Sequence, residues 1–392
     1  ISVFGSESNP GIDKDIKITV LFHSMKDGAK GYVRNIDEYA KSVSPFSNER
    51  EMIYLNVENL ESQLLKGFLA HEFVHLVTFN QKDAKYNVTE DVWLNEARAE
   101  YAPTLLGYND AGLSSDYLAN RLKSFMDNPY ESLVDWQNKT SNYGVISLFS
   151  HYLVDHYGIA VLADSLKSRE VGIESINSAL ARNGFKDNFN DAYTNFIIAS
   201  YINDCSVSEK YCFKEKDLQS FHVMPFSNFL PFSGESTLYL GQSLKDYSAH
   251  WQKYSGGTGS LKLKFENASS GKFVIPYIIK SVSGGTTVGS LKLNNAGEGE
   301  LIVPNMGKEV ASVTVIPSVQ VLNYGDASDF YYYSLTATSF SEGSNADIDN
   351  PGTNITLPFE IDKPLNQMNR EELLTVLLRL IITLLAQGKQ VF

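Results

Sequence analysis

Basic residues and cysteines are both scarce in this 392-residue chain. Its 33 Lys and Arg stand against 46 Asp and Glu, so the formal net charge is −13. No stripe of Lys and Arg offers a footprint for nucleic-acid phosphates, and an acidic surface is not attracted to anionic lipids. These absences exclude nucleic acid as the expected partner. With 43% hydrophobic and 20% charged residues, the chain is instead typical of a globular protein with several domains.

The two cysteines, Cys205 and Cys212, lie seven residues apart in NDCSVSEKYC. They are either two buried thiols or the ends of one small disulfide loop. The turn-forming residues around them, the 22 tyrosines and the Asn-x-Ser/Thr sequons favour the disulfide, and with it a secreted or cell-surface protein. The chain begins at Ile1 without an initiator methionine or a signal-like apolar segment, which suggests a processed form.

Two regions of different pattern precede residue 341. Near the N-terminus, β-branched apolar runs predict buried strands, and apolar residues then recur at helical three- and four-residue steps. We predict an α+β domain over 1–215, strand-rich in about 1–60 and helical in about 61–215. Over 216–340, short strand-like runs separated by turns predict an all-β sandwich domain.

An apolar helix with its own start signal is predicted near the C-terminus. A polar linker at 341–368 leads to it, and Asn369 with Glu372 resembles a capping box. A membrane span needs about 20 apolar residues, whereas this run is shorter and carries Arg379, which costs about 2.5–3.5 kcal/mol at a bilayer centre. A helix docked on its own chain is another alternative. Since apolar residues cover nearly every side, we predict that 369–388 mediates self-association in a homo-oligomer or assembly.

The stretch GFLAHEFVHLVTF places three polar side chains in an otherwise apolar run. His71 and His75 stand four apart, so a helix carries both imidazoles on one face, where they can bind one Zn²⁺ at about 2.0–2.1 Å. Glu72 is rotated by about 100° from His71 and is placed to act on a water at the metal. This is the HExxH arrangement of two ligands and a general base.

A catalytic zinc keeps one open position and therefore needs a third protein ligand. Glu96 in VWLNEARAEYA is the predicted ligand, and Glu100, one helical turn on, can accept the outward N–H of a ligating histidine. The alternative is that the histidines are satisfied core side chains and the two glutamates a solvated helix face. Burying these polar groups without partners costs several kcal/mol, and a metal removes that cost. The pattern therefore favours zinc.

HEFVH followed by NEARAE resembles the gluzincin pattern of thermolysin-like zinc peptidases. LAHEFVHLVTFNQ and WLNEARAEYA resemble still more closely the hyicolysin family of secreted bacterial metallopeptidases. The resemblance covers roughly 16–160 and implies a zincin-like fold with a strand-rich upper lobe over an active-site helix. It also implies the base Glu72 and the zinc ligands His71, His75 and Glu96. Val74 and Ala97 depart from the family pattern at positions that bear on substrate fit.

The expected chemistry is attack of a zinc-activated water on a peptide carbonyl, with Glu72 accepting its proton. Tyr143 is the candidate donor to the oxyanion, because related peptidases carry a tyrosine before a similar helix, although a packing role fits it equally well. His151 is a second candidate for this donor. The predicted strand at 52–58 can pair with an extended substrate.

We therefore predict a secreted zinc-dependent endopeptidase that acts on a protein or peptide substrate. The alternative is a structural, adhesive or assembly-forming surface protein with a metallopeptidase-like domain that is inactive or whose metal only stabilises the fold. An aminopeptidase of the same superfamily is disfavoured, because the chain has no Gly-x-Met-Glu-Asn signature.

Overall fold

A computed structural model describes most of the chain. The described residues are 1–26, 28–108, 117–231, 234–321 and 330–340. Within the chain, Ile1–Glu342 form one compact unit. The predicted linker at 341–368 and the predicted self-association helix at 369–388 lie outside the described residues, so both stay predictions.

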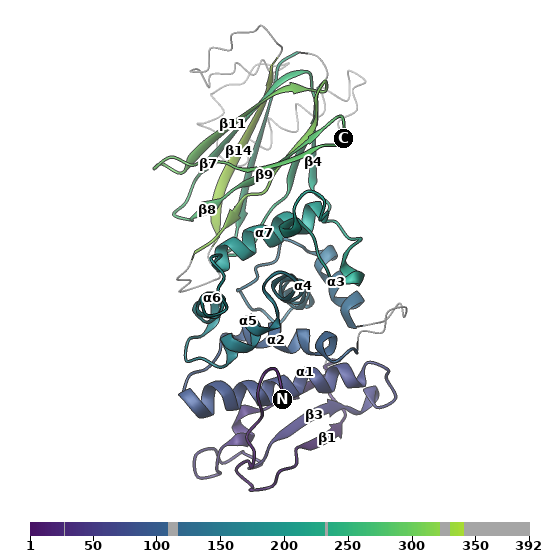
Figure 1. Ribbon diagram of the computed structural model, residues 1–392, viewed down its shortest axis with the longest axis vertical. Helices are drawn as coiled ribbons and strands as arrows, with labels where there is room; N and C mark the ends of the chain where they lie inside the picture. Colours follow the sequence, from purple (N-terminus) through teal and green to yellow (C-terminus); the bar gives the residue numbers. More distant parts are fainter. Residues whose placement is uncertain (27, 109–116, 232–233, 322–329, 341–392) are drawn as a thin grey trace, which may run out of the picture. The chain divides into compact units, whose positions relative to one another are not determined.

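A small three-stranded sheet lies in the N-terminal part (Figure 1). Its strands are β1 (Thr19–His23), β2 (Gly31–Val33) and β3 (Met52–Asn56). β3 is buried along its whole length because it is central, parallel to β1 and antiparallel to β2. Both edges of β3 are occupied, so the expectation that the strand at 52–58 pairs with a substrate is wrong. Among the described strands of this sheet, β1 and β2 are the edges.

Helices form the next part of the chain. They are α1 (Leu65–Thr78), α2 (Val92–Leu105), α3 (Tyr117–Asp127), α4 (Thr140–Tyr157), α5 (Ile159–Leu166), α6 (Gly172–Arg182) and α7 (Phe189–Ile202). A π-helical segment, Phe79–Ala84, continues α1. α4 is buried on nearly every side and contacts α2, α3, α5 and α7, and Figure 1 shows it among them. α1 lies against the small sheet, where Leu76 packs with Ile53 and Leu55 of β3.

Local signals set the ends of these helices. Asn188 and Asp191 form a capping box at the start of α7, and Asn203 ends it in the left-handed conformation at φ 42°. α4 ends at Gly158, whose φ of 79° a residue with a Cβ rarely adopts. These caps satisfy backbone groups that a helix end leaves unpaired.

Strands alone follow residue 225 within the described part of the chain. They are β4 (Phe226–Leu230), β5 (Ser236–Leu244), β6 (Gln252–Gly256), β7 (Gly259–Asn267), β8 (Phe273–Val274), β9 (Pro276–Ser281), β10 (Thr286–Ser290), β11 (Glu298–Met306), β12 (Val310–Val315), β13 (Ser318–Val319) and β14 (Tyr331–Phe340). Nine join one mixed sheet, in which β10-β9-β12-β11-β7-β14-β5 are successive neighbours and β6 pairs with β12 and β4, while β13 pairs with β8. The packing of a two-layer sandwich stays a prediction.

The main hydrophobic core extends from the helices into the strand region. Trp251 is buried in it and donates its indole N–H to the carbonyl of Ile197 on α7, at 3.0 Å. Thr314 of β12 donates to the Tyr201 hydroxyl at 2.8 Å, and both atoms are buried. Buried hydrogen bonds of this kind tie α7 to the sheet. The division into separate domains at residue 216 stays a prediction.

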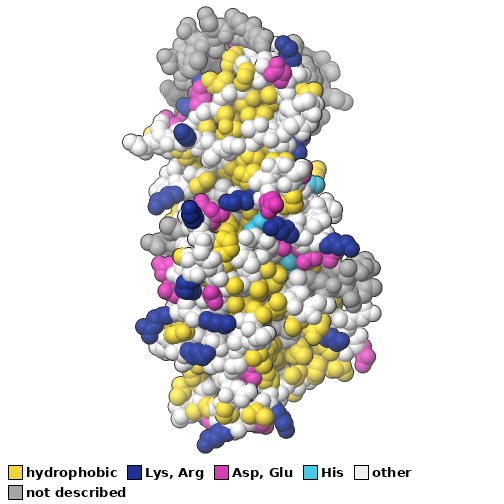
Figure 2. Space-filling view, in the orientation of Figure 1, with side chains coloured by type: hydrophobic (Ala, Val, Ile, Leu, Met, Phe, Trp, Pro, Cys, Tyr) yellow, Lys and Arg dark blue, Asp and Glu magenta, His cyan; other side chains and the backbone are white. Residues whose placement is uncertain are grey.

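The predicted disulfide between Cys205 and Cys212 is confirmed, with their Cα atoms 5.0 Å apart. It closes a small loop after α7, so the alternative of two buried thiols is wrong. On the face drawn in Figure 2, Lys and Arg side chains are interspersed with Asp and Glu and do not gather in one patch.

Among the helices of the described residues, none is by itself long and apolar enough to cross a membrane. Only α4 and α5 taken together pass by length and composition, and they are bent by 111° at their junction.

Candidate metal centre

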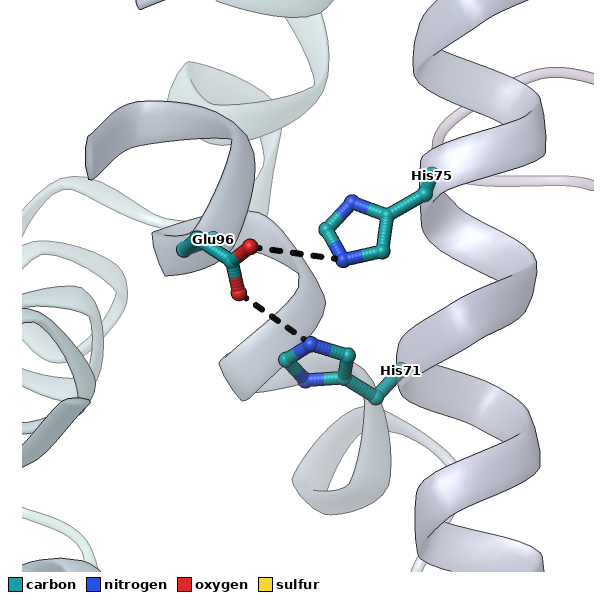
Figure 3. Close-up of side chains that lie close together, drawn as sticks. All are labelled: His71, His75 and Glu96. Atoms are coloured by element: carbon teal, nitrogen blue, oxygen red, sulfur yellow. Dashed lines mark ion pairs between the residues drawn. The ribbon is translucent and has the colours of Figure 1, made fainter. Parts of the chain in front are cut away.

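Two antiparallel helices bring the predicted ligands together. His75 on α1 lies opposite Asn95 on α2. His71, one turn before His75, lies opposite Glu100, which is one turn after Glu96. Between these contacts, the Glu96 side chain points at both imidazoles (Figure 3). Its Oε2 lies 3.2 Å from His71 Nε2, and its Oε1 lies 3.7 Å from His75 Nε2. The i, i+4 spacing of the histidines puts their ring centroids 5.0 Å apart.

The three side chains converge as metal ligands do. One donor atom from each of His71, His75 and Glu96 lies within 4.8 Å of the other two. Glu96 Oε2 is buried and makes no hydrogen bond, although it lies 3.2 Å from His71 Nε2. An orphaned carboxylate oxygen in a buried position is costly unless a cation faces it. The residues present therefore fit a bound metal ion.

The outward nitrogen of His71 is held by a buried network. His71 Nδ1 lies 3.2 Å from Glu100 Oε1 and 3.1 Å from the Tyr117 hydroxyl, which itself donates to Glu100 Oε1 at 2.7 Å. Arg121 adds two charge-assisted bonds to Glu100, from Nε at 2.6 Å and from Nη2 at 2.8 Å. Glu100 therefore orients His71, as a carboxylate behind a ligating histidine does.

The charges of this network follow from its geometry. Burial alone would raise the pKa of Glu100, but Arg121 and then His71 lower it to about 2. Burial would likewise lower the pKa of His71, yet the adjacent carboxylates of Glu100 and Glu96 raise it to about 10. The pocket thus strongly favours a positive charge at the His71 nitrogens, which a proton or a metal ion can supply.

His75 has a different orienting partner. Its Nδ1 lies 3.2 Å from Asn95 Oδ1, which can only accept, so Nδ1 is the nitrogen that donates in this contact. The other nitrogen, Nε2, faces Glu96. Each of the two imidazoles is therefore oriented by a neighbour of Glu96 on α2: His75 by Asn95, and His71 by Glu100.

Glu72 follows His71 on α1 and lines the same cleft as the three candidate ligands. Its side chain is buried, and burial raises its pKa above the ordinary range, while the charges of His71 and His75 lower it. It is absent from the group of converging donors. Glu72 thus lies beside the converging donors and is not one of them, and its role as a base stays a prediction.

A cleft of about 930 Å³ gives access to these residues. The backbone of β2 lies along it, and its aromatic lining is Tyr32, Phe68, Tyr117, Trp136 and Tyr143. Polar side chains share this lining, and aromatic rings beside convergent polar groups are typical of a site that binds an organic ligand.

The two predicted oxyanion donors differ in position. Tyr143 lines the cleft, but its hydroxyl donates to Asn138 Oδ1 at 3.1 Å, so its catalytic role stays a prediction. His151 is buried, with Nε2 at 2.8 Å from the Thr104 hydroxyl and Nδ1 at 2.8 Å from the Ser147 carbonyl. It does not line the cleft, so its candidacy is wrong.

Sequence reasoning missed four residues of the site. Asn95 had a signal, because it directly precedes Glu96 in the NEARAE stretch. Tyr117 and Arg121 stand four apart on α3, which predicts a shared helix face but gives no indication that this face meets Glu100. Trp136 lies in a loop and packs edge-on against Tyr143, with ring centroids 4.8 Å apart.

Comparison with known proteins gives one sequence relative and several weak structural likenesses. No family model matches the chain. Over 170 residues it is 30% identical to the neutral metalloprotease ShpI of Staphylococcus hyicus, a region that covers 38% of this chain and 37% of that protein. The chain thus spans well under two thirds of that relative.

Structural likenesses are weak. The pre-peptidase C-terminal domain of a Bacillus anthracis collagenase has a TM-score of 0.22 at 8% identity, covering 29% of this chain and 96% of that one. A Yersinia pseudotuberculosis mitogen has a TM-score of 0.19 at 14% identity, covering 29% and 92%. Scores this low carry no argument about fold or function. What the comparisons support is similarity, over part of the chain, to a metalloprotease.

Proposed function

We propose that this chain is a zinc-dependent endopeptidase of the gluzincin type, similar to the hyicolysins. The observation that carries the proposal is the convergence of His71, His75 and Glu96 beside Glu72 in an open cleft. Two imidazoles and one carboxylate are the protein ligands of thermolysin-type catalytic zinc. The partial similarity to a metalloprotease supports the same reaction class.

Zinc is the metal that we propose, because this donor set of two nitrogens and one carboxylate oxygen leaves a fourth position open. When bound, it supplies Lewis acidity and a water with a lowered pKa. The orphaned Oε2 of Glu96 and the oriented nitrogens of His71 and His75 are the atoms that would hold it.

The remaining steps belong to the chain's own side chains. Glu72 accepts a proton from the attacking water and returns it to the leaving amine. Tyr143 donates a hydrogen bond to the developing oxyanion after its hydroxyl has broken the hydrogen bond to Asn138. The free edge of β2 holds the substrate in extended form. The disulfide supports a secreted or cell-surface location, since disulfides persist in oxidising compartments.

The decisive experiment separates metal binding from proton transfer. Glu72→Gln should retain one zinc per chain and lose cleavage of a casein-type substrate, because glutamine cannot accept the proton. Glu174→Gln, an exposed glutamate on α6, is the control and should keep full activity. Unchanged cleavage by Glu72→Gln would remove Glu72 from the reaction. A wild-type chain that holds zinc yet cleaves no peptide would favour the alternative of a surface protein with a stabilising metal.

A further inference from the structure

Gly31, the first residue of β2, packs directly against Glu72. A Cβ built on Gly31 would lie 2.8 Å from Glu72 Oε1 and 2.9 Å from its Cγ. It would also lie 2.9 Å from Cδ2 of Leu55 on β3. Since real Cβ contacts essentially never fall below 3.0 Å, any side chain at position 31 must displace one of these groups.

The glycine is needed here for space and not for backbone conformation. Gly31 is absent from the positive-φ glycines of the chain and lies in an ordinary strand. Leu55 is 1% exposed within the packed core under the sheet, so it has no room to retreat. The contact with Glu72 reaches Cγ as well as the carboxylate oxygen, so a turn of the carboxylate alone does not relieve it.

We propose that Gly31 is a positioning residue for Glu72, an inference that rests on the proposed peptidase function. The missing side chain allows the free edge strand of the cleft and the base carboxylate to lie in van der Waals contact. A peptide paired with β2 would then meet Glu72 at a distance fixed by the fold, with no side chain between them.

The effect on catalysis should be large because the displacement falls on a reacting group. A misplacement of about 1 Å can cost about 10²-fold in rate. The imidazoles of His71 and His75 face Glu96 and are not among the nearest groups that a Cβ on Gly31 would meet, so metal content should not change. Loss of rate with retained metal distinguishes a positioning role from a general structural one.

The test compares Gly31→Ala with Gly241→Ala. Gly241 is also a strand glycine, but its Cβ would meet Tyr239 no closer than 3.7 Å, an ordinary contact. Gly31→Ala should lose about 10²-fold in kcat while it keeps its zinc and a similar KM. Gly241→Ala should behave like the wild type.

A double-mutant cycle tests whether Gly31 acts through Glu72. In the Glu72→Gln background, Gly31→Ala should cause no further loss of the residual rate, because the group that it displaces is already disabled. If Gly31→Ala does not fold, Gly31→Ala with Leu55→Val removes the Cδ2 obstacle and leaves Glu72 as the group to be displaced.

Two negative results have different meanings. Two results would overturn the role of Gly31 and leave the proposed function standing. One is wild-type activity in the folded Gly31→Ala variant, and the other is a loss in the Glu72→Gln background as large as the loss in the wild type. A wild-type protein that cleaves no peptide would overturn the proposed function, and the inference with it.

Discussion

Two buried charge clusters lie along α1 with its π-helical continuation and along the segment that leads into α2. They differ in how their charged groups are paired. In the first, Lys82 donates to the carbonyls of Ser165, Ser168 and Glu170 and lies 3.4 Å from Glu90. In the metal centre, three donor atoms converge and Glu96 Oε2 has no hydrogen-bond partner.

The first cluster is closed by protein groups. Arg98 donates to Glu90 at 2.8 Å and to the Ser165 hydroxyl at 2.9 Å, and the Gly172 N–H donates to Glu90 at 2.7 Å. Only Arg98 Nε lacks a partner there among the side-chain atoms of Lys82, Glu90 and Arg98. Burial of charge is therefore not by itself a sign of function. The convergence of potential ligand atoms from three side chains beside an open cleft is the informative feature.

Glu38 shows a third way to neutralise a buried carboxyl group. It is partly buried beside Glu51, and no ion pair among the described residues includes it. Burial first, and then the charge of Glu51, raise its pKa to about 8. A counter-cation at Glu90, a proton at Glu38 and the proposed metal ion at Glu96 are thus three ways to neutralise a buried carboxyl group, and each predicts a different response to mutation.

The largest effect is expected at the metal centre. Glu96→Ala should abolish peptide cleavage and weaken zinc binding by more than about 100-fold, because it removes a ligand and not only its support. Its circular dichroism spectrum should match that of the wild type. Zinc titration with a competing chelator measures the affinity. Undiminished zinc affinity in this variant would show that Glu96 is not a ligand.

The closed cluster should respond in stability and not in metal binding. Glu90→Gln leaves the cations of Lys82 and Arg98 without their anion and should cost about 3–5 kcal/mol in the free energy of unfolding. Asp127→Asn, which breaks the exposed pair with Lys123, is the control and should leave the free energy of unfolding nearly unchanged. Urea denaturation measures both. A loss of zinc affinity in folded Glu90→Gln would contradict the separation of the two clusters.

Loss of one hydrogen-bonding group behind His71 should have an effect of intermediate size on zinc affinity. Tyr117→Phe keeps the buried ring and removes the hydroxyl that contacts both Glu100 and His71, so zinc affinity should fall by about tenfold. Tyr86→Phe, which removes a hydroxyl bonded to the Lys167 carbonyl, should leave the affinity unchanged. Equal affinities in the two variants would mean that Glu100 holds His71 without help.

The smallest effect concerns the proton of Glu38. Between its ordinary pKa of 4.5 and the folded value of about 8, the folded state holds a proton that the unfolded state lacks. The stability from this group is therefore complete below about pH 4.5 and is lost as the pH rises toward 8. Between about pH 5 and pH 8, the Tm of Glu38→Gln should fall less than that of the wild type. Parallel curves would show that Glu38 is already ionised at pH 5.

Local spacing made part of the site predictable. His71, Glu72 and His75 lie within one helical turn, so their relation needs no tertiary information. Glu96 required the meeting of two helices, which the need for a third ligand and the resemblance to a known motif both indicated. Arg121 and Tyr117 were missed because nothing in the sequence of α3 shows which face meets Glu100.

The edge of the small sheet was mispredicted for a physical reason. The MIYLN run of β3 is apolar without alternation, which indicates a strand covered on both faces but does not show whether its edges are paired. β2 contains only Gly31–Val33, too short for a periodicity to emerge. Its position in the cleft follows from antiparallel pairing with β3, in which Gly31 pairs with Leu55 and Val33 pairs with Ile53.

The brevity of β2 limits how this cleft can recognise a peptide. Along a three-residue edge, alternate residues direct their N–H and C=O groups outward, so an incoming chain meets very few main-chain partners. If the proposed function is right, so few contacts would favour a flexible loop or an unfolded segment and would depend little on its length. Discrimination between one peptide and another would then depend on what the aromatic walls accept.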